Sequence, residues 1–169
     1  TLQWFHFRLT GGKGKLCRMH IENAGEVSYP AGWPNFNTYA SYDGEEWFCV
    51  PTTYTDGVLT FEHIPQVNSM FFAYSPPYSY QRHLELIGSS QLSELCTWES
   101  LGKTVQGRDI DMLVVGTPDA TKRKIWMVAR QHPGEPQAEW FVEGALARLL
   151  DPFDAVSRTL LSKAVFYIV

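Results

Sequence analysis

Two residues of a single polar loop have side chains that could bind a metal ion together. His132 and Glu135 belong to the segment 130–135, which reads Arg-Gln-His-Pro-Gly-Glu. An imidazole nitrogen and a carboxylate oxygen suit Zn²⁺, and a catalytic zinc usually has three protein ligands and one open position for water. The pair would supply two of those three ligands. On spacing alone the alternative is a His and a Glu that are simply solvated, because His-x-x-Glu arises easily by chance.

The elements on either side of this loop are expected to be a buried strand and a helix. Ile125 to Ala129 is an apolar run of buried-strand length. Pro136 stands where a first helical position belongs, and Pro152 should stop the helix at Asp151. Apolar residues recur between them at helical spacing: Ala138, Phe141, Val142, Ala145, Leu146, Leu149 and Leu150. Ligands of open α/β sheets gather outside the carboxyl ends of strands, so this setting favours a binding site.

The loop and its flanking elements resemble the zinc-binding segment of the M14 metallocarboxypeptidases. With Pro133-Gly134 between its two candidate ligands, the loop resembles that of the cytosolic carboxypeptidase subfamily more than that of the digestive carboxypeptidases, which usually carry Ser-Arg there. Other stretches are similar to the β-rich amino-terminal domain of that subfamily: Trp4–Phe7, Ile21–Gly25, Ser41–Trp47, Val50–Tyr54 and Phe72–Tyr80. The resemblance covers essentially the whole chain. It implies an all-β antiparallel sandwich domain at residues 1–76 and the first part of an α/β catalytic domain, a mixed sheet with flanking helices, at residues 77–169.

The resemblance also implies an activity, the hydrolysis of carboxy-terminal peptide bonds by a zinc-dependent metallocarboxypeptidase. Acidic or glutamate-bearing peptides are among the expected substrates, because some relatives remove glutamates from acidic tails. His132 and Glu135 would hold Zn²⁺, which lowers the pKa of a bound water from about 15.7 to about 7. Arg130 and Gln131 are weaker candidates for contact with the substrate. The family's third ligand, general base and carboxylate-binding arginines lie downstream of the matching segment, so we expect them beyond Val169.

Two other classes of function stay open. One is a non-catalytic module in which the β-rich half binds a protein or a glycan. The other is a zinc amidohydrolase or aspartoacylase-like enzyme, which can share the His-x-x-Glu loop. Those relatives are not expected to carry the amino-terminal domain.

Composition narrows the partners and the compartment. A formal net charge of −4 and a pI near 5.7 argue against binding to a nucleic-acid backbone, which requires a basic face. No stretch approaches the roughly 20 apolar residues that cross a bilayer. The three cysteines, Cys17, Cys49 and Cys96, are widely spaced and form no Cys-x-x-Cys pair. A reducing cytoplasm therefore fits better than a disulfide-forming compartment.

The amino-terminal half is expected to consist of short strands. Phe5 to Leu9 alternates apolar and polar residues, and the Gly-rich turn after it predicts a hairpin with the strand 16–21. Further strands are expected at 47–50, 58–61 and 70–74, which favours an antiparallel sandwich. We expect the many aromatic rings to pack in its core rather than to form a glycan- or peptide-binding face. Four histidines are interpreted as strand or loop residues rather than ligands: His6, His20, His63 and His83.

The carboxy-terminal half should begin with a helix capped by Ser79 and ended by Gly88. A strand pair at 95–105 and 109–116 follows, joined near Gln106-Gly107. The apolar run 164–169 predicts a further buried strand, and the sequence ends inside it. An unfinished apolar strand would need cover on its edge and faces, so we expect the chain to be incomplete.

Overall fold

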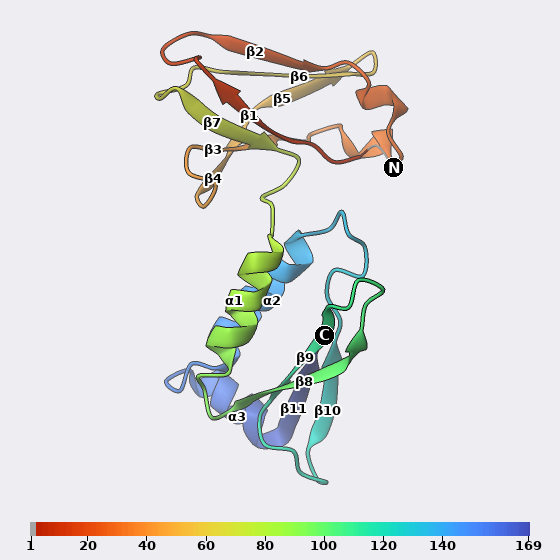
Figure 1. Cartoon of the computed structure of the whole chain (residues 1–169), viewed down its shortest axis with the longest axis vertical. Coiled ribbons are helices and arrows are strands. Elements are labelled where there is room, and N and C mark those ends of the chain that lie inside the picture. Colours follow the sequence, from red (N-terminus) through yellow and green to blue (C-terminus); the bar gives the residue numbers. More distant parts are fainter. Residues whose placement is uncertain (1–2) are drawn as a thin grey trace. The chain divides into compact units, whose positions relative to one another are not determined.

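The computed structural model describes residues 3–169 and divides into two compact units, Thr1–Pro77 and Tyr78–Val169 (Figure 1). The first unit is built from strands and the second combines a sheet with helices. None of the helices in residues 3–169 is both long and apolar enough to cross a membrane.

The first unit contains two antiparallel sheets, with strand orders β1-β7-β3-β4 and β2-β6-β5 (Figure 1). Its elements are β1 (His6–Thr10), β2 (Cys17–Ile21), the 3₁₀ turns η1 (Ala24–Glu26) and η2 (Pro30–Gly32), β3 (Thr38–Ser41), β4 (Trp47–Val50), β5 (Thr52–Thr55), β6 (Val58–His63) and β7 (Ser69–Ala73). β3 and β5 were not expected from the sequence. The predicted antiparallel β architecture is confirmed.

The core of this unit lies between the inner faces of the two sheets. Phe61 of β6 and Phe72 of β7 are buried, with ring centroids 5.3 Å apart. Trp33 is buried too, and its indole N–H donates to the carbonyl of Ala24 at 2.8 Å. The prediction of an aromatic core is confirmed for these three rings.

The predicted hairpin between β1 and β2 is wrong. β1 pairs with β7, and β2 pairs with β6, so the two strands belong to different sheets. The Gly-rich connection is bonded elsewhere: the N–H of Gly11 donates to the carbonyl of Asn68, and that of Gly14 to Pro65. Both glycines have positive φ, which few other residues adopt without strain. The connection therefore carries the chain from one sheet to the other.

The second unit has a mixed sheet of order β10-β11-β9-β8, in which only β10 and β11 are parallel. Its elements are α1 (Tyr80–Ser90), β8 (Cys96–Lys103), β9 (Asp109–Val115), β10 (Arg123–Met127), α2 (Gln137–Leu149), α3 (Ala155–Lys163) and β11 (Ala164–Ile168). The expected mixed sheet with flanking helices is confirmed, and so is the β8–β9 pair. One apolar cluster joins the sheet to all three helices and includes Leu113, Phe166, Leu86, Leu146 and Leu161.

The helices depart from the sequence expectation in three places. Phe141 was assigned to the buried side of α2 but is 66% exposed, because helical spacing gives a stripe without saying how wide the covered part is. Gly88 lies inside α1, which continues to Ser90. α3 was not expected, although Asp154 caps it by accepting from the N–H groups of Val156 and Ser157.

A candidate metal centre in the loop after β10

The loop that holds His132 and Glu135 begins where β10 leaves the sheet. Pairing with the chain after β11 continues past the end of β10, because the N–H of Ala129 donates to the carbonyl of Val169 at 2.9 Å. Arg130 then has a φ of +47°, in the left-handed region that non-glycine residues rarely adopt. This residue turns the chain away from the strand direction and into the loop.

His132 and Glu135 face each other within the loop. Nδ1 of His132 lies 3.0 Å from Oε2 of Glu135, and the N–H of Glu135 donates to the carbonyl of His132 at 3.1 Å. Their side chains are 75% and 52% exposed. α2 begins two residues after Glu135, with the buried Pro136 as its N-cap residue. Strand, loop and helix therefore stand in the expected order.

This pair fits part of a zinc site. An imidazole nitrogen and a carboxylate oxygen converge at the carboxyl end of β10, and both are ligands that Zn²⁺ accepts. Within residues 3–169, no group of three or more His, Cys, Asp or Glu side chains is placed to hold a metal ion. The described residues thus offer two ligands, one fewer than a catalytic zinc usually takes from a protein.

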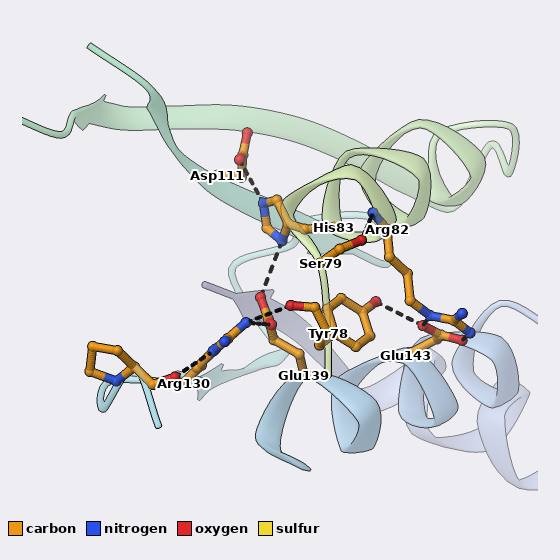
Figure 2. Close-up of polar contacts among 9 residues, drawn as sticks. Tyr78, Ser79, Arg82, His83, Asp111, Arg130, Glu139 and Glu143 are labelled. Carbon is orange, nitrogen blue, oxygen red and sulfur yellow. Dashed lines mark hydrogen bonds and ion pairs between the residues drawn. The ribbon is translucent and has the colours of Figure 1, made fainter. Parts of the chain in front are cut away.

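Arg130 spans the loop and its surroundings with one guanidinium group (Figure 2). Its Nε donates to the carbonyl of Pro133 at 3.2 Å, and its Nη1 donates to the carbonyl of Tyr78 at 3.0 Å. The same Nη1 lies 2.5 Å from Oε2 of Glu139 on α2. Gln131, the other residue named as a possible substrate contact, is exposed. Of the two proposed substrate contacts, Arg130 is therefore bonded to protein groups, whereas Gln131 lies at the surface.

Glu139, the partner of Arg130, lies next to a polar cluster that the sequence did not indicate. Nε2 of His83 is 2.9 Å from Oδ2 of Asp111, and Nδ1 of His83 is 3.6 Å from Oε1 of Glu139 (Figure 2). The indole N–H of Trp98 donates to the other Asp111 oxygen at 2.6 Å. His83 lies on α1, inside the helix expected after Ser79, and not on a strand or in a loop. Only the tertiary fold brings its partners near, so no local spacing could have revealed them.

The cluster borders a cavity of about 370 Å³ in the second unit. Arg130, Glu139, His83 and Asp111 line it together with apolar residues of α1, α2, β9 and β11. The polar groups are thus at the boundary between the loop and the apolar interior.

A second polar cluster lies one helical turn further along α2, at Glu143. Nη2 of Arg82 is 2.7 Å from Oε1 and Nε is 2.8 Å from Oε2 of this carboxylate, and the hydroxyl of Tyr78 donates to Oε2 at 2.7 Å. The guanidinium of Arg82 also lies over the Trp140 ring, 4.2 Å from its centroid. The bonds from Arg82 hold the pKa of Glu143 below its ordinary value, and burial raises the pKa of Tyr78.

Two family models match this chain, one in each of its two units. The family model described as zinc carboxypeptidase matches residues 84–169, and the one described as the cytosolic carboxypeptidase N-terminal domain matches residues 1–75. The chain therefore belongs to the M14 zinc carboxypeptidase family and carries the amino-terminal domain of its cytosolic members. The resemblance seen in the sequence is confirmed.

Individual relatives are similar to this chain over nearly its whole length. An uncharacterized protein of Zymomonas mobilis is 43% identical over 166 residues, which are 98% of this chain and 43% of that protein. The crystal structure of a metallo-carboxypeptidase from Burkholderia cenocepacia is 46% identical, with a TM-score of 0.93 over 99% of this chain and 46% of that one. A metallo-carboxypeptidase from Pseudomonas aeruginosa is 40% identical, with a TM-score of 0.92 over 99% and 45%. The chain spans less than half the length of these relatives.

Proposed function

We propose that the protein to which this chain belongs is a zinc-dependent metallocarboxypeptidase that hydrolyses carboxy-terminal peptide bonds. In this proposal His132 and Glu135 are two of its zinc ligands. The observation that carries it is the approach of the imidazole Nδ1 to the carboxylate Oε2, 3.0 Å apart in an exposed loop. The strand before this loop, β10, lies at the edge of its sheet and is only partly buried, so the expected burial of the run 125–129 on both faces is wrong. The similarity to two solved metallo-carboxypeptidases, at 46% and 40% identity, supports the assignment.

Each group of the loop has a separate part in this function. His132 and Glu135 hold the metal at the carboxyl end of β10, and their exposure leaves the site open to a peptide end. Bound zinc would supply a Lewis acid and an acidified water. Gln131 is exposed beside the ligands and is a candidate contact for the substrate. The third ligand and the general base are expected from the part of the relatives' length that this chain does not cover.

Finer features of the function are also proposals. We propose that acidic or glutamate-bearing peptides are among the substrates. The (2-guanidinoethylmercapto)succinic acid bound by the Pseudomonas aeruginosa relative carries two carboxylic acids and a guanidino group, so it is compatible with a terminal residue of either charge. Rates on peptides that differ only in a terminal Glu, Lys or Leu would test this preference. Rates on acylated amino acids would test the amidohydrolase alternative. We propose a cytoplasmic location, because the three free cysteines are in keeping with a reducing compartment. We also propose that the chain comprises two domains with their boundary at residues 76–77.

Zinc content of the full-length protein tests the ligand assignment. His132→Ala and Glu135→Ala should each remove the bound zinc and the peptidase activity, while circular dichroism stays that of the wild type. His20→Ala is the matched control, because His20 is also exposed but bonds Thr60 of the first unit. Stoichiometric zinc in either loop variant would disprove the assignment.

A further inference from the structure

Residues 130–135, which contain the two proposed ligands and which we call the ligand loop, have a backbone conformation that their sequence does not favour. Arg130 has a φ of +47°, where glycine or asparagine is the usual residue. An arginine there carries backbone strain, and the conformation persists only where the surrounding structure holds it. The side chain of Arg130 supplies that fixation through three protein groups, one in the loop and two outside it.

The contact within the loop acts directly between the two proposed ligands. Nε of Arg130 donates to the carbonyl of Pro133, the residue that follows His132 and precedes Glu135 by two positions. A charged donor on this carbonyl limits the rotation of the peptide plane that joins the ligands. The orientation of both ligand side chains therefore depends on where the guanidinium is held.

Outside the loop, the carbonyl of Tyr78 and the carboxylate of Glu139 hold the guanidinium, and the second oxygen of Glu139 lies beside the ring of His83. Oε2 receives Nη1 of Arg130 at 2.5 Å, and Oε1 faces Nδ1 of His83 at 3.6 Å. His83 is fixed in turn by Asp111 of β9, whose side chain is 7% exposed. The side chain of Glu139 is only 18% exposed, so water competes little for its carboxylate. The series of contacts ends on a strand of the central sheet.

We infer that Glu139 is a positioning residue for the zinc ligands and acts through Arg130, with His83 and Asp111 holding its carboxylate in place. We call these four residues the loop clamp. The inference rests on the proposed function, since it concerns the same site. None of the four is required to touch the metal or the substrate. Residues that orient metal ligands typically change metal affinity about 10- to 100-fold when they are mutated.

A pair of isosteric variants tests this inference in the full-length protein. Glu139→Gln keeps the size of the side chain but removes its charge, and should raise the Kd for zinc about 10- to 100-fold in competition with a chelator. It should also change the visible absorption spectrum of the Co²⁺-substituted protein, because the ligand geometry shifts. Glu143→Gln, one turn further along α2, is the matched control and should leave both readouts at wild-type values.

Two further variants decide between the possible outcomes: Arg130→Lys, which tests the same contact from its other side, and His132→Ala, which tests the ligand itself. Arg130→Lys keeps the positive charge but lacks the planar fork, so it should also weaken zinc binding about 10-fold even if Glu139→Gln fails to fold. Wild-type zinc affinity in Glu139→Gln or Arg130→Lys would overturn the inference. If His132→Ala retains zinc, the proposed ligand is wrong. If His132→Ala loses zinc while Glu139→Gln binds it normally, only the positioning role fails.

Discussion

Two carboxylates on one helix, Glu139 and Glu143, have similar partners but hold different parts of the molecule. Each is paired with an arginine, and their side chains are 18% and 29% exposed. The arginine of Glu139 comes from the ligand loop, whereas that of Glu143 comes from α1. We call Tyr78, Arg82 and Glu143 the helix clamp. In the roles proposed above, the segment that supplies the arginine, and not the ion pair itself, separates the carboxylate that serves the site from the one that serves the scaffold.

The largest effect on stability is expected at the buried end of the loop clamp. Asp111→Ala removes a carboxylate that is 7% exposed and bonds two partners, the partly exposed ring of His83 and the indole N–H of Trp98, which is itself 37% exposed. Each hydrogen bond to a charged group contributes about 1.5–3 kcal/mol, and water can replace part of what these partners lose, so we expect a total loss of about 2–4 kcal/mol of unfolding free energy. Urea unfolding of the full-length protein would measure the loss.

The control for this variant is Asp119→Ala, which removes a carboxylate from an exposed loop. The carboxylate of Asp119 accepts from the N–H and the hydroxyl of Thr121 in an exposed turn, so its loss should destabilise the protein less than the loss of Asp111. Equal losses in the two variants would contradict the claim that the buried end anchors the loop clamp.

A smaller effect is expected from Tyr78→Phe in the helix clamp. The substitution removes the hydroxyl that donates to Glu143 at 2.7 Å, and hydrogen bonds to charged groups contribute about 1.5–3 kcal/mol. The backbone carbonyl of Tyr78, which accepts from Arg130, is unchanged. Thermal unfolding should therefore shift while the zinc affinity stays that of the wild type. A weaker zinc affinity would show that the two clamps are not independent.

The sequence predicted the parts of this comparison that depend on local pattern. Ile125–Ala129 is apolar and Pro136 precedes a helical repeat, so the strand, loop and helix around His132 and Glu135 could be placed without a structure. The observed β10 and α2 begin and end within a few residues of the expectation. Periodicity and proline positions act over a few residues, which is why they are visible in one sequence.

Features that depend on distant contacts could not be predicted in this way. The pairing of β1 with β7 rather than with β2 is decided by which sheet buries each apolar face, and nothing in the turn reports it. The meeting of His83 with Asp111 joins residues 28 positions apart. A left-handed Arg130 is likewise unexpected from propensity, and such exceptions are typical of functional sites.

Acid should weaken the helix clamp, by an amount smaller than the loss of the Tyr78 hydroxyl because the carboxylate is partly solvated. The bonds from Arg82 lower the pKa of Glu143 below its ordinary value of 4.5. A group with a lowered folded-state pKa stabilises the protein fully above its unfolded pKa, and this contribution disappears as the pH falls through the folded pKa.

The melting temperatures of wild type and Glu143→Gln should therefore differ most above the ordinary pKa of 4.5 and converge as the pH falls through the lower folded-state pKa of Glu143. All other carboxylates are common to both proteins, so the difference isolates Glu143. A gap that widens as the pH falls would reverse the assigned direction of the shift.

The smallest effect is expected at an arginine–carboxylate pair in the first unit, Arg18 with Glu62. These residues face each other across β2 and β6 and form an ion pair, like those of the two clamps. Their side chains are 59% and 40% exposed, so water and salt screen the pair and exposed pairs contribute only about 0–1 kcal/mol. Glu62→Gln should change the urea midpoint by less than Glu143→Gln does, and the change should shrink further in 1 M salt. A loss at Glu62 equal to that at Glu143 would show that exposure does not rank these pairs, and that the clamps on α2 owe nothing to their partial burial.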